Sequence, residues 1–363
     1  MKIDNNCEKI LDKALSEQPI NREEAIQLMQ VDLHSPEMYA LCSAANDMSR
    51  RHFNNYGDVC AQIGLDSGSC YGNCEFCFFA ARNKMVGEGI KYSKEAVLRS
   101  AIECDRQKPN ALLLMTTCNY EFDDFLEIGY AVHEAVSPNL PLVANIPDFD
   151  DDQARALVEA GFCAVYHAVR LNEGKDTAFP VEQRIATMKA AKKAGLAVQT
   201  CVEPLGPEHS VEQQVESMFL GREMGVTFSG AGYRITVPGS PLARYGEVTH
   251  WYLARTVAVT RLVMGDTVVA NCTHEPNMPS ILAGANLLWA EIGTNPRDAN
   301  KETEKSRGLS VDQCWQFLLN AGYERRTGPS PSVMGLAWNK AHGSVMESGI
   351  GKQYETTSGQ TNV

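Results

Sequence analysis

The sequence reads Val59-Cys-Ala-Gln-Ile-Gly-Leu65 and, after four intervening residues, Cys70-Tyr-Gly-Asn-Cys74-Glu-Phe-Cys77. The first run is apolar and of strand length, so it predicts a buried β-strand. The second places three thiols in a stretch of small residues directly after that strand. Because three thiols side by side have no packing rationale, we interpret this loop as a set of metal or iron–sulfur ligands.

The spacing CxxxCxxC favours an iron–sulfur cluster over zinc. A structural zinc site normally takes four protein ligands, and no fourth Cys or His is near the triplet in the sequence. Three thiolates on a short loop reach three corners of a cube-shaped cluster and leave one iron open. The glycines of the loop, Gly68 and Gly72, allow the backbone to approach the cluster closely. Zinc binding and accidental clustering remain the alternatives.

Seven further apolar runs predict strands, and amphipathic segments between them predict helices. These runs are Ala111–Thr116, Leu142–Ile146, Cys163–Val169, Ala197–Val202, Phe228–Val237, Thr267–Asn271 and Asn286–Glu291. Eight strands that alternate with helices imply parallel pairing through right-handed crossovers. We therefore expect an α/β fold, a (β/α)8 barrel with an N-terminal helical extension, with an open doubly wound sheet as the alternative. In either fold the chemistry belongs at the carboxyl ends of the strands.

The predicted organisation has three parts. Apolar residues recur at helical spacing in residues 1–55, which we expect to form a helical segment. Residues 56–349 are expected to form the barrel with its C-terminal helix. Residues 350–363 are polar and are expected to form a flexible tail.

Composition narrows the function classes. The 363 residues are 44% hydrophobic and 21% charged, as in ordinary globular proteins, and the net charge is -12. An acidic balance argues against a nucleic-acid or anionic-membrane partner. No apolar run is long enough for a transmembrane helix, and the N-terminus lacks the apolar centre of a signal peptide. We therefore expect a cytoplasmic protein, in which the twelve cysteines form no disulfide framework.

The cysteine motif, with an aromatic residue before its last cysteine, resembles the radical S-adenosylmethionine (SAM) superfamily. Arg51-His52-Phe53 before the first strand and Ala283-Gly-Ala-Asn286 before the last are similar to biotin synthase and its relatives. Those relatives are the HydE-type hydrogenase maturase, HmdB, methylornithine synthase and the archaeal two-part lipoyl synthase. The resemblance extends from about residue 52 to residue 322 and implies a full (β/α)8 barrel.

The resemblance also implies the chemistry. Cys70, Cys74 and Cys77 would hold a [4Fe–4S] cluster whose open iron is chelated by the amino and carboxylate groups of SAM. An electron donor such as flavodoxin or ferredoxin would reduce the cluster, and SAM would split into methionine and a 5′-deoxyadenosyl radical. That radical would abstract hydrogen from a small-molecule substrate.

Five further residues match SAM-binding positions of the family. Phe76 would lie against the adenine, and Thr116 and Thr117 would receive the SAM amino group. Arg184 would pair with the SAM carboxylate, for which a planar guanidinium is suited. Asn172 occupies the position of an acidic residue expected at the ribose, so this sequence departs from the family there. A core aromatic and a solvated helix-face arginine are the structural alternatives for Phe76 and Arg184.

Biotin synthase itself would need a second cluster, bound by cysteines after strands two, three and five and by an arginine on strand seven. Cys118 and Cys201 match the first and third of these positions, but the third strand has no cysteine and the seventh has no arginine. The resemblance therefore argues against biotin synthase itself. Cys118, Cys201 and Cys272 all point to one barrel mouth, and we hypothesise an auxiliary Fe–S cluster or a sacrificial sulfur there. Three separate buried thiols are the alternative.

His274 follows the seventh strand, where it would position a substrate or move a proton near neutral pH, unless it makes only a local structural bond. Three functions remain open. The first is a radical SAM enzyme of cofactor biosynthesis that acts on a small molecule. The second is sulfur insertion as a lipoyl-synthase-type component, with a carrier or partner protein. The third is a non-catalytic Fe–S or zinc scaffold.

Overall fold

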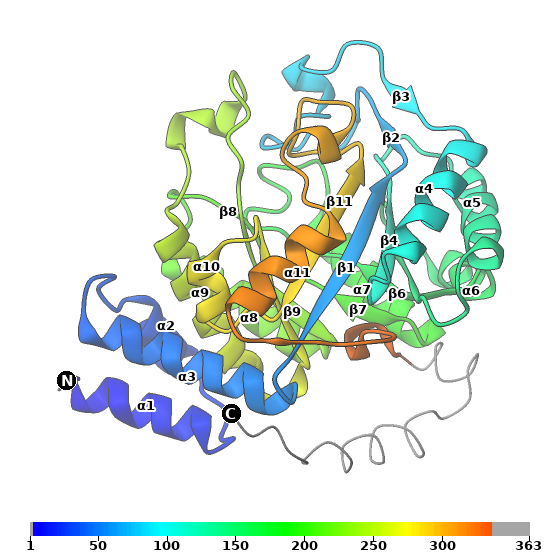
Figure 1. Ribbon diagram of the computed structural model, residues 1–363. Coiled ribbons are helices and arrows are strands. Elements are labelled where there is room, and N and C mark those ends of the chain that lie inside the picture. Colours follow the sequence, from blue (N-terminus) through cyan, green and yellow to red (C-terminus); the bar gives the residue numbers. More distant parts are fainter. Residues whose placement is uncertain (1–2, 336–363) are drawn as a thin grey trace, which may run out of the picture.

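The structure, a computed structural model, describes residues 3–335. The barrel strands are β1 (Tyr56–Gly64), β4 (Ala111–Met115), β5 (Leu142–Asn145), β6 (Phe162–Tyr166), β7 (Ala197–Gln199), β9 (Phe228–Tyr233), β10 (Ala270–His274) and β11 (Leu287–Gly293). They pair in parallel in the order β1-β4-β5-β6-β7-β9-β10-β11, and β11 pairs with β1 to close the ring (Figure 1). The predicted (β/α)8 barrel is confirmed, and closure excludes the open doubly wound sheet.

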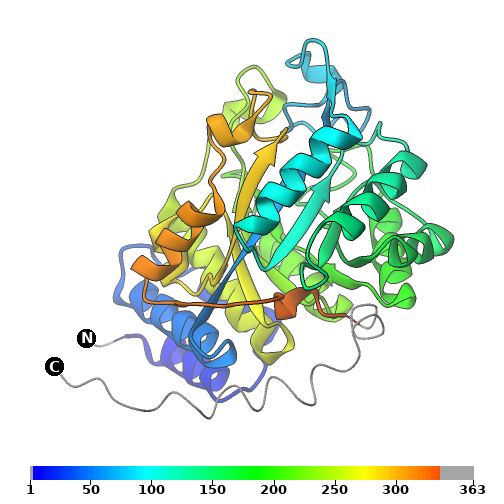
Figure 2. The same ribbon diagram turned by 45° about the vertical axis from the view of Figure 1, so that its right-hand side comes forward.

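The helices are α1 (Asn5–Leu15), α2 (Arg22–Met29), α3 (Pro36–His52), α4 (Lys94–Arg106), α5 (Phe122–Ala135), α6 (Asp151–Glu159), α7 (Val181–Ala194), α8 (Val211–Met224), α9 (His250–Met264), α10 (Met278–Leu282) and α11 (Val311–Asn320). From α4 onward they surround the barrel (Figure 2). Polar caps begin several of them; the Ser310 side chain, for example, accepts a hydrogen bond from the Gln313 amide at the start of α11. Within residues 3–335 no helix combines the length and the hydropathy needed to cross a membrane.

Two apolar cores hold these layers together. The larger lies between the strands and α4 to α7 and α11, where for example the rings of Phe125 and Phe162 stack with centroids 5.1 Å apart. The second joins α1 to α3 to α8 and α9. Polar contacts reinforce this second junction, since the Ser49 hydroxyl donates to the Gly284 carbonyl at 2.6 Å. The helices α1 to α3 lie toward the end of the barrel away from the cysteine loop (Figures 1 and 2).

Several predicted strands differ in their bounds from the observed ones; β6 ends at Tyr166 rather than Val169, and β9 ends at Tyr233 rather than Val237. β10 begins at Ala270, because Gly265–Thr267 form a 3-10 turn in which the Thr267 hydroxyl donates to the Met264 carbonyl at 2.5 Å. The predicted strand Ala197–Val202 is interrupted, and β7 is followed by a separate strand β8 (Val202–Leu205) with a shifted register against β9. Cys201 therefore lies at the break between β7 and β8.

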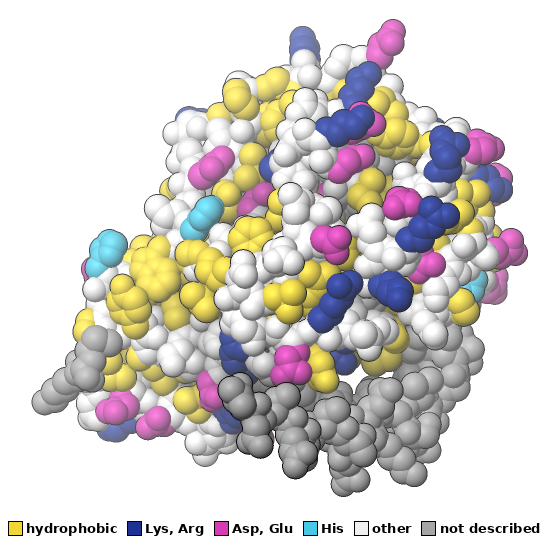
Figure 3. Space-filling model, in the orientation of Figure 1, with side chains coloured by type: hydrophobic (Ala, Val, Ile, Leu, Met, Phe, Trp, Pro, Cys, Tyr) yellow, Lys and Arg dark blue, Asp and Glu magenta, His cyan; other side chains and the backbone are white. Residues whose placement is uncertain are grey.

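The last described segment runs across the end of the barrel where the strands begin (Figure 2). After α11, strand β12 (Glu324–Arg325) pairs with the start of β1. The expected end of the barrel segment at residue 349 and the expected tail 350–363 lie outside the described residues. On the face in Figure 3, basic side chains are interspersed with acidic ones rather than gathered into one basic surface.

The Asn110 side chain links this terminal segment to β1 through hydrogen bonds, and its replacement tests how much that link stabilises the fold. The Asn110 side chain accepts a hydrogen bond from the Val59 amide at 2.8 Å and donates to the Gly328 carbonyl at 2.8 Å. We expect Asn110→Ala to lower the free energy of unfolding by about 1–3 kcal/mol, because the buried Val59 amide loses its partner. Urea unfolding of the variant measures this loss. The exposed control Asn139→Ala should be neutral, and equal midpoints for the two variants would refute the role of Asn110.

Candidate active site

A cavity opens at the carboxyl ends of the barrel strands. Its wall includes the three loop cysteines with Phe76, and its other residues come from strand ends and the loops that follow them. The polar and aromatic residues around it are Gln62, Asp66, Thr116, Thr117, Asn145, Tyr166, Arg170, Phe179, Arg184, Glu203, Tyr233, Arg234, His274, Trp289, Asn295 and Arg297. This placement agrees with the rule that barrel chemistry sits at this end.

The cysteine loop follows β1 and is held across the mouth by backbone hydrogen bonds. The Glu75 amide donates to the Asp176 carbonyl at 2.8 Å, and the Phe78 amide donates to the Pro296 carbonyl at 3.0 Å. Asp176 lies in the loop after β6, and Pro296 lies in the loop after β11. The loop is thereby anchored to two segments on opposite sides of the ring.

Gly72 occupies a position with no room for a side chain. A Cβ atom there would lie 2.9 Å from the Phe179 ring and 3.2 Å from the Cys118 sulfur. Only glycine lets the loop pass this close to its neighbours. The sequence prediction that small residues allow close wrapping therefore has a specific cause at this position.

The three loop thiols all line the cavity, and they do not lie within 4.8 Å of one another as a single-ion group would. Their binding of an iron–sulfur cluster remains a prediction. Backbone amides face two of the sulfurs: the Cys118 amide lies 3.4 Å from the Cys70 sulfur and the Phe79 amide 3.3 Å from the Cys77 sulfur. Such donors stabilise thiolate charge. A hydrogen bond from the Cys118 side chain is the main reason that the pKa of Cys70 is lowered to about 6.

The two threonines at the end of β4 differ in their availability to a ligand. The Thr117 hydroxyl and amide both bond to Asp66, at 2.5 and 2.7 Å. The Thr116 hydroxyl is buried, lines the same cavity and makes no hydrogen bond within the described residues. An unpaired buried hydroxyl costs free energy unless a ligand completes it. The Thr116 hydroxyl is therefore available to a ligand in this cavity, which Phe76 also lines. Contact of Thr116, Thr117 and Phe76 with SAM remains a prediction.

Arg184 and Asn172 differ in whether they line the cavity. Arg184 lines the cavity, is buried, and donates to the Asp148 carboxylate at 3.0 Å and the Ala168 carbonyl at 3.2 Å. Asn172 is not among the cavity residues of the described chain; its amide bonds to Asp176 at 3.0 Å and to Gln213 at 2.7 Å. Contact of Arg184 with the SAM carboxylate and of Asn172 with the ribose both remain predictions.

The three further cysteines fall into two places. Cys118 lies beside Cys70 at the loop. Cys201 and Cys272 lie deeper, next to His274, and Cys118 does not share their group within the described residues. The structure therefore divides the set that the sequence placed at one mouth, and the auxiliary cluster remains a hypothesis.

Several residues of the cavity were not foreseen. Tyr166 ends β6, and its buried hydroxyl makes no hydrogen bond to residues 3–335. Arg234 follows β9 directly. The Arg170 guanidinium lies 3.8 Å from the Glu173 carboxylate and 4.0 Å from that of Glu203, both longer than hydrogen bonds. A signal was present for Arg170, which directly follows the predicted strand Cys163–Val169. Tyr166 and Arg234 fall inside predicted strands that end earlier in the structure.

The Asp148 carboxylate contacts both Arg184 and the buried His167. Nε2 of His167 lies 2.9 Å from the Asp148 carboxylate that Arg184 also contacts. The pKa of His167 is lowered to about 3, first because burial disfavours the charged ring and second because Arg184 is positive. Burial alone would raise the pKa of Asp148, but the hydrogen bond from His167 and the charge of Arg184 lower it. The pair is therefore a neutral imidazole and an ionised carboxylate.

Comparison with known proteins supports the resemblance that the sequence indicates. No protein-family model matches the chain. It is 31% identical over 261 residues to biotin synthase of Desulforudis audaxviator, covering 68% of this chain and 76% of that protein. It is 27% identical over 272 residues to biotin synthase of Clostridioides difficile, covering 72% and 82%. Fold and site thus define an enzyme of the radical SAM class.

Solved structures agree with the fold. Methylornithine synthase (PylB) superposes with a TM-score of 0.71 at 16% identity, covering 87% of this chain and 97% of that one. HydG, a maturase of the [FeFe]-hydrogenase, superposes with a TM-score of 0.73 at 15% identity, covering 89% and 76%. The chain belongs to the biotin-synthase-like branch of the radical SAM superfamily. That class implies a [4Fe–4S] cluster and SAM, and the cysteines for the cluster are present.

The neutral state of His167 predicts a pH dependence of stability. In the unfolded chain the ring takes up a proton below about pH 6.5, whereas in the folded chain it does so only near pH 3. Stability is therefore lost as the pH falls through this window, by about 2 kcal/mol between pH 7 and pH 5. Denaturant unfolding at the two pH values measures the change. His167→Gln should remove this part of the slope and the exposed control His34→Gln should keep it; an unaltered slope in His167→Gln would contradict the assignment.

Proposed function

We propose that this chain is a radical SAM enzyme of cofactor biosynthesis that removes a hydrogen atom from a small molecule held in the barrel cavity. One observation carries the proposal: the three loop cysteines line the same cavity as a set of convergent polar side chains from the strand ends. A cavity of this kind, with few polar groups and an open metal position, is a typical substrate site. Membership of the radical SAM superfamily supplies the reaction class.

The residues divide the work between them. Cys70, Cys74 and Cys77 would hold the cluster, and Thr116, Arg184 and Phe76 would bind SAM. When bound, these groups supply the 5′-deoxyadenosyl radical that abstracts hydrogen. The protein orients the substrate and keeps water away from the reacting carbon, which the buried position of Tyr166 and Trp289 supports.

The charges around the cavity support a substrate with an anionic group. Arg297 is paired with Glu275 at 3.2 Å and Arg234 with Glu208, so their charges are already compensated. Among the described residues, the Arg170 guanidinium makes only the two longer ion pairs given above. A carboxylate of the substrate would gain hydrogen bonds there that the protein carboxylates do not make.

The substrate is proposed to differ from that of biotin synthase. Neither β5 nor β10 carries the second-cluster residues that the resemblance requires at those strands. Sulfur insertion into an octanoylated carrier is the second candidate, because Cys201 and Cys272 place two thiols beside the cavity. Analysis of products from candidate acids and octanoyl carriers separates the two.

The cluster and its reaction are tested together. Anaerobically purified and reconstituted protein should bind about four iron atoms at the loop and form 5′-deoxyadenosine from SAM under dithionite. Cys74→Ser should lose at least nine-tenths of this activity, because the cluster loses one of three ligands. Cys163→Ser, a buried thiol on β6, is the matched control and should keep it. A colourless zinc protein without SAM cleavage would establish a scaffold instead. Deuterium transfer from a labelled substrate into 5′-deoxyadenosine would identify the substrate.

Arg184 is tested by SAM affinity. Arg184→Lys keeps the positive charge but loses the planar fork, so we expect SAM binding to weaken about tenfold. Equilibrium dialysis of the reconstituted, unreduced protein measures the dissociation constant without turnover. The exposed Arg155→Lys serves as the control. Unaltered SAM affinity with reduced thermal stability would leave Arg184 a purely structural role.

A further inference from the structure

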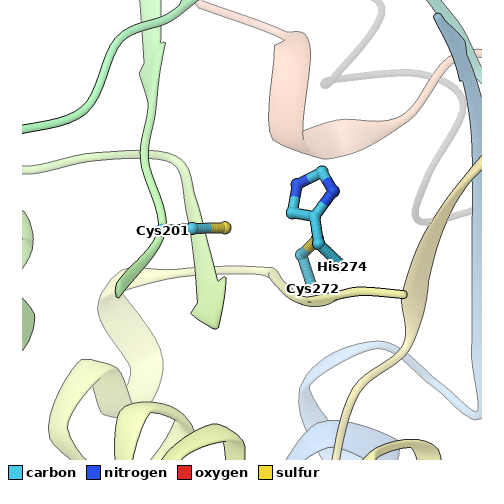
Figure 4. A group of neighbouring side chains, drawn as sticks. All are labelled: Cys201, Cys272 and His274. Carbon is cyan, nitrogen blue, oxygen red and sulfur yellow. The ribbon is translucent and has the colours of Figure 1, made fainter. Parts of the chain in front are cut away.

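A second group of possible metal ligands lies inside the barrel. Cys201 comes from the break between β7 and β8, and Cys272 and His274 come from β10. One ligand atom of each lies within 4.8 Å of the other two. All three residues are buried, with exposed fractions of 1%, 0% and 8%. Figure 4 shows the Cys201 sulfur pointing across toward the side chains of Cys272 and His274.

The strand between them is shaped to allow this approach. β9 pairs with β10, and it places Gly230 in register with Cys272 and Gly232 in register with His274. A Cβ atom at Gly232 would lie 2.9 Å from the His274 Cβ, and one at Gly230 would overlap the backbone of Cys272. The absence of side chains at these two positions therefore lets β9 lie directly against the backbone of Cys272 and the side chain of His274.

The histidine has a ring nitrogen without a hydrogen-bond partner in the part of the chain that the structure describes. Nε2 of His274 is buried and makes no hydrogen bond within the described residues. The ring is held by Trp289, stacked at 6.4 Å and 7°, and by Tyr166, edge-on at 6.1 Å. A buried nitrogen left unsatisfied is destabilising, so the held ring favours a bound group that completes it.

We propose that Cys201, Cys272 and His274 bind one soft divalent metal ion, zinc or ferrous iron, whose fourth position faces the substrate cavity. Two thiolates and an imidazole are the donors that such ions prefer, and three protein ligands with one open position are typical of a catalytic zinc. His274 lines the cavity, so the open position borders the substrate. This site goes beyond the proposed function and relies on it only for the position of the substrate.

Spacing and charge both fit a single ion. Ligands at about 2.0–2.3 Å from a tetrahedral zinc stand roughly 3.5 Å apart, so atoms within 4.8 Å of one another need only small side-chain movements. Two thiolates neutralise a divalent cation, which keeps the buried site uncharged overall. The fourth position would take an oxygen, nitrogen or sulfur donor of the substrate and orient it below the cluster loop.

Metal counting tests the site on the full chain. The background is a variant with Cys70, Cys74 and Cys77 all replaced by Ala, which removes the loop ligands. After chelator treatment and loading with Zn²⁺ alone or Fe²⁺ alone, we expect about one tightly held ion per chain. Adding Cys201→Ser and Cys272→Ser to this background should reduce the amount of bound ion per chain at least tenfold. Adding Cys163→Ser and Cys314→Ser instead, two buried thiols elsewhere, should not.

The absorption spectrum of bound cobalt(II) tests the site even where a variant folds poorly. Cobalt(II) loaded into the same background should show sulfur-to-cobalt charge transfer and the strong visible bands of a tetrahedral ion, and His274→Ala should shift those bands. Three outcomes would overturn the proposal: no bound ion, acid-labile sulfide that is lost with Cys201 and Cys272, or a disulfide between these two cysteines in the anaerobic protein. An ion that binds here while the native chain fails to cleave SAM would refute the proposed function and leave this site standing.

Discussion

Two peptide hydrogen bonds, from Glu75 to Asp176 and from Phe78 to Pro296, hold the cysteine loop across the mouth of the barrel. They reach the loops after β6 and β11, which lie four strands apart in a ring of eight and therefore on opposite sides. A loop anchored at only one side would let its thiols drift, and a cluster with three ligands tolerates little drift. The closed barrel is what makes the two anchors available at a constant separation.

The same closure concentrates charge at one end. Strand ends bring Arg170, Arg234 and Arg297 to one cavity, and carboxylates behind the wall compensate them to different degrees. Arg184 is compensated by Asp148, which bonds to it and is in turn held by the neutral His167. The cavity is thus pre-organised, with few polar groups that must reorient when a ligand enters.

The pairing of β9 with β10 brings together a second group of side chains inside the barrel. Gly230 and Gly232 remove side chains from β9 where it pairs with Cys272 and His274 of β10. Cys201, at the β7–β8 break, lies close to the same two residues. Glycine weakens a strand interior, so two of them in one six-residue strand mark a place where close approach outweighs strand stability. The buried sulfur pair and His274 occupy that place.

The sequence by itself determined the features that depend on local patterns. The short apolar runs predicted the eight strands, and the CxxxCxxC spacing predicted the cluster loop. Both signals could be found because each is contained within a few consecutive residues. The sequence did not show that Cys118 lies with Cys70 while Cys201 lies with Cys272, nor that Asn172 turns to Asp176 and Gln213. Nor did it place β10 three residues later than expected or bring Arg170 into the cavity. These outcomes depend on strand register, on the break after β7 and on which loops meet over the mouth, and only the closed ring brings such distant segments into contact.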